Sequence, residues 1–142
     1  MNIKKRVNQL VRKYKTRNPL EIAENMGCII IRQPLNGVRG FYHYFQRNHI
    51  ICIDDSLPEH IVKFVVAHEL GHIILHKGSN AIFMDTNTFF VRNKLENQAN
   101  KFAIELLITD DDICEYSDFT VSQLSRIFGY EKNLIEIKLT TH

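Results

Sequence analysis

Hydrophobic side chains recur at helical spacing at the start of the chain. Between Ile3 and Tyr14 they form one stripe of an amphipathic helix, and lysines and arginines cover the opposite face. We interpret this basic face as a solvated surface rather than a nucleic-acid site. Asn18-Pro19 is a helix cap followed by a first-turn proline, which predicts a second helix through Asn25.

Three short apolar runs then predict a small sheet. Cys28–Arg32 has the composition of a buried strand, and Gly40–Tyr44 and His49–Asp54 are two further strands joined across residues 46–48. Because these strands are neighbours in the sequence, we expect them to pair as an antiparallel meander.

Helical patterns fill the rest of the chain. The first of these helices is capped by Asp54, Asp55 or Ser56 and extends to about His76. Residues 79–91 look irregular, and the later helices are expected at Arg92–Ile108, Val121–Phe128 and Glu131–Leu139. Thr109 and the three aspartates after it form a cap and an acidic first turn for another short helix. The predicted class is α+β.

Composition indicates an ordinary globular protein. The chain has 142 residues, of which 44% are hydrophobic and 24% charged, and its net charge is +2. That balance gives no support for a nucleic-acid or membrane partner. Three cysteines without CxxC spacing favour reduced thiols, and neither a secretory signal nor a membrane helix is predicted. We therefore expect a cytoplasmic protein.

The sequence His68-Glu69-Leu70-Gly71-His72 has HExxH spacing inside a predicted helix. Histidines at i and i+4 lie on one helix face and can share a metal ion. Glu69 points elsewhere on the helix and is the candidate general base. Zinc lowers the pKa of a bound water from 15.7 to about 7, which allows a carboxylate to take its proton.

A catalytic zinc site needs a third protein ligand. His76 lies about 12 Å along the helix axis from His68, too far for the same ion, and is assigned a supporting role near the helix end. His43, His49 and His60 have no informative spacing, and Cys114 lies in a short acidic segment of surface type.

Glu96 is the strongest candidate for that ligand, because it lies beside the apolar stripe of the following helix. Asn100, one turn later, is placed to hydrogen-bond a ligating histidine and fix its tautomer. Glu105 lies off this face and is predicted to be exposed.

These two motifs together resemble the ImmA/IrrE family of metallo-endopeptidases. The resemblance covers roughly residues 18–108 and rests on HELGH with Leu75-His76, followed by Glu96-x-x-Ala99-Asn100-x-Phe102-Ala103-x-Glu105-Leu106-Leu107. It implies that His68, His72 and Glu96 bind zinc and that Glu69 is the general base. Family members often have Met-Pro where this chain has Ile108-Thr109.

The resemblance also implies a fold and a partner. Residues 1–108 would form a minimal zincin domain, with N-terminal helices, a small antiparallel sheet, the metal helix and the Glu96 helix. Residues 109–142 would form a short helical tail packed on it. Many members cleave a helix-turn-helix repressor of a phage or mobile element, which makes such a repressor the expected protein substrate.

The sequence leaves two features of the reaction undecided: the group that stabilises the oxyanion and the strand that binds the substrate. Tyr42, His43, Tyr44 and Tyr116 are all candidate donors to the developing oxyanion. Substrate is expected to add as a strand to a sheet edge, with His49–Asp54 and Gly40–Tyr44 as candidate edges.

Two non-proteolytic functions compete with this prediction. Val121–Leu139 has the spacing of a helix-turn-helix unit, but its cations Arg126, Lys132 and Lys138 are opposed by Glu131 and Glu136. One alternative is therefore a DNA-binding regulator, and the other is a protein that sequesters a repressor without cutting it. In both alternatives the zinc site would be structural.

Overall fold

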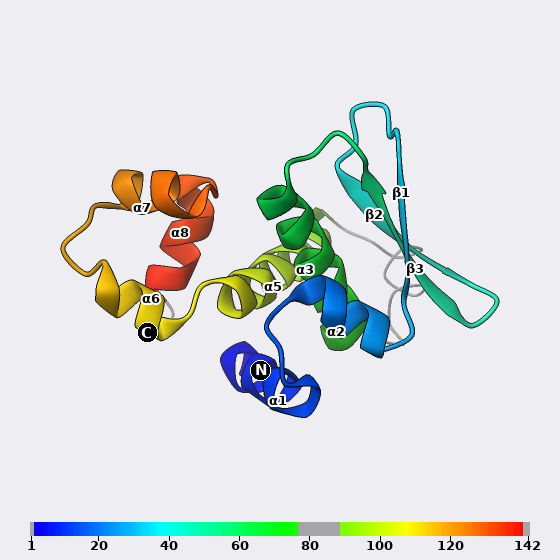
Figure 1. Cartoon of the computed structure of the whole chain (residues 1–142), viewed down its shortest axis with the longest axis horizontal. Helices are drawn as coiled ribbons and strands as arrows, with labels where there is room; N and C mark the ends of the chain where they lie inside the picture. Colours follow the sequence, from blue (N-terminus) through cyan, green and yellow to red (C-terminus); the bar gives the residue numbers. More distant parts are fainter. Residues whose placement is uncertain (1, 77–88, 141–142) are drawn as a thin grey trace.

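The computed structural model describes residues 2–76 and 89–140, and it confirms the α+β class. The described elements, in chain order, are α1 (Ile3–Tyr14), α2 (Pro19–Asn25), β1 (Ile29–Gln33), β2 (Gly40–Phe45), β3 (Asn48–Asp54), α3 (Glu59–Leu75), α5 (Phe89–Leu107), α6 (Asp110–Glu115), α7 (Val121–Phe128) and α8 (Lys132–Leu139). In Figure 1 the sheet and the C-terminal helices lie at opposite ends of the molecule, with α3 and α5 between them. None of the helices in the described ranges is both long and apolar enough to cross a membrane.

The sheet is mixed, which corrects the expected antiparallel meander. Its strand order is β1-β3-β2, with β2 antiparallel and β1 parallel to β3. Gln46 and Arg47 both have positive φ, which is the geometry of a two-residue hairpin turn and explains the antiparallel pair. The longer connection after β1 places β2 on the far side of β3, so β1 meets β3 in the parallel sense.

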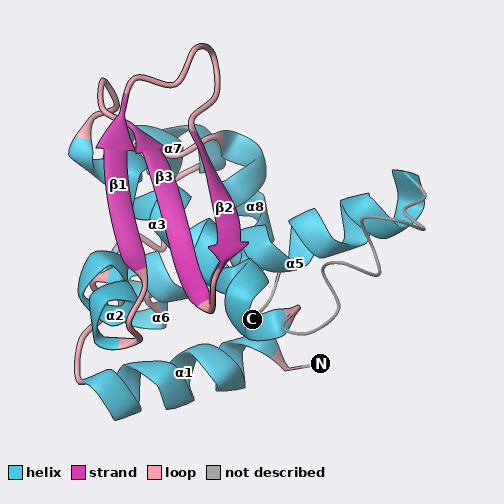
Figure 2. Ribbon diagram, turned by 90° about the vertical axis from the view of Figure 1, so that its right-hand side faces the viewer, coloured by secondary structure: helices cyan, strands magenta, loops and turns pink. Residues whose placement is uncertain are grey.

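Helices cover one face of the sheet. Figure 2 shows the three strands in front of α3, with the other face turned to the viewer. Ile51 and Ile53 of β3 face α3 and are fully buried, whereas Ile29 and Ile31 of β1 are 43% and 38% exposed. The prediction of a buried first strand is therefore wrong, because its apolar composition does not show how many faces are covered.

The helices α3 and α5 form the centre of the core. Val66 and Leu70 of α3, and Phe102 and Leu106 of α5, are completely buried. Asp54, a predicted cap for α3, accepts a hydrogen bond from the backbone N–H of Leu35 instead, and Pro58 occupies the cap position without a side-chain hydrogen bond. Helix α5 begins at Phe89, three residues before the prediction, while most of the expected irregular segment, residues 77–88, lies outside the described residues.

The C-terminal helices pack onto α5 and, through Tyr130, onto α3. Thr109 forms the predicted cap of α6, as part of a capping box with Asp112. Glu105 is only 4% exposed, against the expectation of a surface residue, because Nζ of Lys138 in α8 lies 3.1 Å from its carboxylate. The same ammonium group lies 2.9 Å from Asp110, which also pairs with Lys4 of α1.

Candidate metal centre

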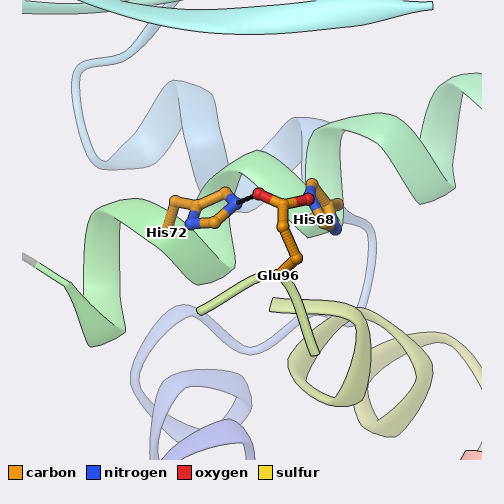
Figure 3. Close-up of side chains that lie close together, drawn as sticks. All are labelled: His68, His72 and Glu96. Carbon is orange, nitrogen blue, oxygen red and sulfur yellow. Dashed lines mark hydrogen bonds and ion pairs between the residues drawn. The ribbon is translucent and has the colours of Figure 1, made fainter. Parts of the chain in front are cut away.

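Two histidines of α3 face one carboxylate of α5. The Nε2 atom of His68 lies 3.1 Å from Oε2 of Glu96, and the Nε2 atom of His72 lies 2.8 Å from Oε1. Figure 3 shows the two rings on either side of this carboxylate, which enters from the neighbouring helix. The structure therefore brings together all three side chains predicted as metal ligands.

A close helix contact places Glu96 opposite the histidines. A Cβ atom added at Gly71 would lie 3.1 Å from Cα of Ala99 and 3.2 Å from Cβ of Phe102. Glycine on α3 and alanine on α5 thus allow the two backbones to approach closely one turn beyond Glu96. Sequence reasoning gave the glycine inside HELGH no role, although its position between two buried helices carries this signal.

The electrostatics of the three groups are coupled. Hydrogen bonds from His68 and His72 hold the pKa of Glu96 far below its ordinary value. Burial lowers the pKa of His68, but the hydrogen bond with Glu96 and the nearby carboxylates outweigh it, so the net shift is upward. The side chain of Asn100 adds to that upward shift of the His68 pKa.

Glu69, which lies between the two histidines in the sequence, has a different environment. It is 8% exposed, and burial raises its pKa above the ordinary value despite the opposing effect of His68 and His72. A raised pKa makes a carboxylate a better proton acceptor near neutral pH.

The three ligand atoms fit a small divalent cation. All lie within 4.8 Å of one another, and neighbouring ligands of a tetrahedral ion with bonds of about 2.1 Å are roughly 3.4 Å apart. The side chain of Glu96 is 49% exposed, so the group of three side chains is accessible to solvent. Within the described part of the chain, Nδ1 of His68 is buried without a hydrogen-bond partner. Two imidazoles and one carboxylate are the donor set of many catalytic zinc sites.

The other histidines considered from the sequence lie elsewhere, with one exception. His43 and His49 belong to the sheet, and the ring of His60 contacts Tyr130. His76 is 4% exposed and reaches the centre indirectly, since its Nδ1 lies 3.0 Å from Nδ1 of His72.

One residue near the candidate metal centre, Gln98, was not predicted from the sequence. Oε1 of Gln98 lies 2.9 Å from Nε2 of His76. No sequence pattern marks this glutamine, because its partner lies 22 residues earlier on another helix. Cys114, the remaining alternative ligand, is an exposed residue of α6.

The fold and the candidate metal centre define a class of protein: a metallopeptidase-type α+β domain with an HExxH helix under a small sheet. Residues 23–140 match the peptidase family described as the IrrE N-terminal-like domain. The chain belongs to this family, which confirms the resemblance to ImmA/IrrE proteins, and membership implies a divalent metal.

Individual relatives agree with this assignment. The chain is 38% identical over 139 residues to "uncharacterized immunity region protein 2" of Bacillus phage phi105, covering 96% of this chain and 88% of the relative. It is 29% identical over 144 residues to the metallopeptidase ImmA of Bacillus subtilis (strain 168), covering 97% and 84%.

A solved structure shares the fold. A Mycobacterium tuberculosis transcriptional regulator superposes with a TM-score of 0.69 at 15% identity, over 98% of this chain and 46% of that chain. Since this chain spans under half of that protein, the likeness concerns the fold alone.

Proposed function

We propose that the protein is a zinc-dependent endopeptidase that cleaves a helix-turn-helix repressor and so relieves repression of a phage or mobile element. The observation that carries the proposal is the convergence of His68, His72 and Glu96 beside a buried Glu69. Relatives named as an immunity region protein and as the metallopeptidase ImmA support the regulatory setting.

The chemistry divides between a metal and the chain. His68, His72 and Glu96 would hold zinc, which when bound lowers the pKa of a water and polarises a carbonyl. Glu69 then accepts a proton as water adds to the peptide carbon, and it donates that proton to the departing amine. His76 hydrogen-bonds His72 and orients its ring, while Asn100 interacts with His68 and raises the pKa of that imidazole.

The position of β2 favours it as the substrate-binding edge. β3 lies in the middle of the sheet, so the prediction that His49–Asp54 is an edge is wrong, whereas β2 is an edge strand of the sheet that the described residues form. A Cβ atom at Gly40 would lie 2.5 Å from Val65, which shows that β2 runs directly over α3. An extended peptide pairing with β2 would therefore pass along the metal helix.

Tyr42 is the best placed of the four oxyanion donors considered. It lies two residues beyond Gly40, about 7 Å along the strand, and Glu69 lies one turn beyond Val65, about 6 Å along the helix. Burial raises the pKa of Tyr42, and the negative charge of Glu69 adds to the rise. Tyr116, by contrast, contacts Phe119 and Phe128 among the C-terminal helices.

Co-expression with a candidate helix-turn-helix repressor from the same genetic element tests the proposal. The repressor's mass is measured with the wild-type protein and with Glu69→Gln, which keeps the shape but removes the base. We expect one defined cut with the wild type and a rate lower by about 10²- to 10⁴-fold with the variant. A repressor that stays intact with both but is bound and inactivated would favour sequestration instead. Metal analysis of the purified wild type identifies the ion, because the same ligands also suit other divalent metals.

The structure weakens the DNA-binding alternative. Lys138, one of three cations in the segment 121–139, is buried in ion pairs with Glu105 and Asp110. Arg126 and Lys132 then remain as the cations of this segment available to phosphates. Salt-sensitive binding to a specific duplex in a retardation assay would restore that hypothesis.

A further inference from the structure

The ring of His72 has a hydrogen-bond partner on each nitrogen. Its Nε2 faces Glu96 at 2.8 Å, and its Nδ1 lies 3.0 Å from Nδ1 of His76. Nε2 of His76 lies in turn 2.9 Å from Oε1 of Gln98. His72, His76 and Gln98 therefore form a hydrogen-bonded chain that starts at the metal position and ends on an amide, and His76 in its middle is buried.

When a metal is bound, the number of protons on the two imidazoles determines which group donates in each hydrogen bond of this series. A neutral imidazole has one N–H group and one lone pair. For Nε2 of His72 to offer its lone pair to a metal, the proton of His72 must lie on Nδ1, from which it is donated to Nδ1 of His76. The proton of His76 must then lie on Nε2, where it needs an acceptor, and Oε1 of Gln98 is that acceptor.

The opposite direction suits the protein without metal. There Nε2–H of neutral His72 donates to Glu96, so Nδ1 of His72 accepts a proton from His76. Nε2 of His76 then requires a donor, which Gln98 supplies once its amide turns to present the NH₂ group. An amide is both donor and acceptor, whereas a carboxylate accepts only. Glutamine at this position therefore serves both states.

From this geometry we propose that Gln98 is a positioning residue of the metal centre. By accepting the hydrogen bond of His76, it selects the His72 tautomer whose Nε2 lone pair is free for the metal. The inference rests on the proposed function only in taking His72 as a ligand through Nε2. Gln98 itself is not one of the three candidate ligands.

Zinc affinity of three variants tests the proposal. Gln98→Met keeps the length of the side chain without its acceptor, Gln98→Glu keeps an acceptor alone, and Asn97→Glu adds the same charge at the exposed neighbouring position. Affinity is measured at neutral pH by competition between the purified protein and a chromogenic zinc chelator. We expect Gln98→Met to weaken zinc binding about tenfold or more, the usual effect of losing such an outer partner. Gln98→Glu should bind zinc at least as tightly as the wild type, and Asn97→Glu should stay within twofold.

Nitrogen-15 spectra of the histidine rings provide a direct readout that a purely structural role would not change. In the zinc-loaded wild type, His72 should carry its proton on Nδ1 and His76 on Nε2, and in Gln98→Met the Nε2–H resonance of His76 should shift because its acceptor is gone. Zinc binding by Gln98→Met within twofold of the wild type, or a proton on Nδ1 of His76 in the zinc form, would overturn the inference.

The same measurements separate this inference from the proposed function. A wild type that binds no zinc would overturn both, whereas zinc binding that is independent of Gln98 would overturn the inference alone. If the tautomers and zinc affinities are as expected but the protein cuts no repressor, the role of Gln98 is supported and the proposed cleavage of a repressor is contradicted.

Discussion

Glu69 and Glu96 interact electrostatically with the same pair of histidines, yet their surroundings shift their pKa values in opposite directions. Burial raises the pKa of Glu69, while hydrogen bonds from His68 and His72 lower that of Glu96. A carboxylate that stays ionised is suited to hold a cation, and one that takes up a proton more readily is suited to act as a base. Two identical carboxylate groups can therefore carry out different parts of one reaction.

Tyr42→Phe tests the donor at the residue scale. The hydroxyl of Tyr42 lies 2.7 Å from Nδ1 of His49, and a proton on that nitrogen would leave the tyrosine O–H free to donate to the oxyanion. Loss of one such donor costs up to about 10²- to 10³-fold in kcat, and we expect the lower end because zinc shares the charge. Steady-state cleavage of a repressor peptide should show a fall in kcat with little change in KM.

Tyr44→Phe is the matched control for that experiment. Tyr44 lies two residues further along the same face of β2, and its side chain is 54% exposed. Its substitution should leave kcat within a factor of about two, as expected of a surface position. Equal losses of kcat in both variants, or a change in KM alone, would contradict the role given to Tyr42.

The sequence predicts the ligand residues better than their supporting contacts. HExxH spacing is a local property of one helix, so it already groups His68 and His72, and Glu96 follows from its place beside the apolar stripe of the next long helix. Gln98 and Gly71 depend on how two helices meet. That contact is set by packing between distant segments, and a single sequence does not reveal it.

At the scale of elements, one buried ion pair joins α8 to α5. Lys138 is 1% exposed and bonds Glu105, which is itself buried. Removing one partner of such a pair leaves an uncompensated charge, so we expect Lys138→Met to lower the free energy of unfolding by roughly 3–5 kcal/mol. Urea denaturation of the purified variant measures this change.

Two further variants decide whether the loss comes from the stranded charge. Lys138→Met combined with Glu105→Gln should recover part of the stability, because no buried carboxylate is then left unpaired. Lys132→Met, which removes an exposed lysine of the same helix, should change stability by less than about 0.5 kcal/mol. A double variant less stable than Lys138→Met would contradict this explanation.

Asp110 makes part of this junction sensitive to acid. Hydrogen bonds from Lys138 and Lys4 lower its pKa from 3.8 to about 2 in the folded protein. The unfolded chain therefore takes up this proton at higher pH, and the stabilisation is complete above pH 4 and is lost as the pH falls towards 2. The stability difference between wild type and Asp110→Asn should shrink over that interval. Unfolding experiments on metal-free protein at several pH values measure this difference.

The bounds of helices were predicted more accurately than the pairing of strands. The bounds of α1, α2 and α7 agree with the sequence prediction, because caps and apolar spacing are local signals. The pairing of β1 with β3 is not local. It depends on the path of residues 34–39, and the apolar character of Ile29 and Ile31 is equally consistent with a covered and an open face.

For the whole molecule, the candidate site and the core share the same two helices. α3 carries His68 and His72, while α5 carries Glu96, and both also supply the central buried side chains. α5 extends from the metal centre to the C-terminal helices, where α8 packs against it (Figure 1). Stability of the C-terminal helices is therefore coupled to the helix that positions Glu96.

This coupling predicts the outcome of ending the chain at Ile108, the boundary expected from the sequence. Leu124, Leu134 and Ile135 are at most 7% exposed and belong to the same core cluster as Phe102 and Leu106. Each such burial contributes about 1.5–3 kcal/mol, against a total stability of roughly 5–15 kcal/mol for a typical domain. The shortened chain also leaves Glu105 without Lys138.

We therefore expect residues 1–108 to unfold at a much lower urea concentration than the full chain and to bind zinc more weakly. Circular dichroism and chelator competition measure the two effects on the same samples. The family match through residue 140 also argues that the last helices belong to the domain. A fragment with a cooperative transition and a zinc affinity equal to those of the full chain would instead establish residues 1–108 as an independent domain. The C-terminal helices would then be free to serve in substrate recognition without supporting the metal centre.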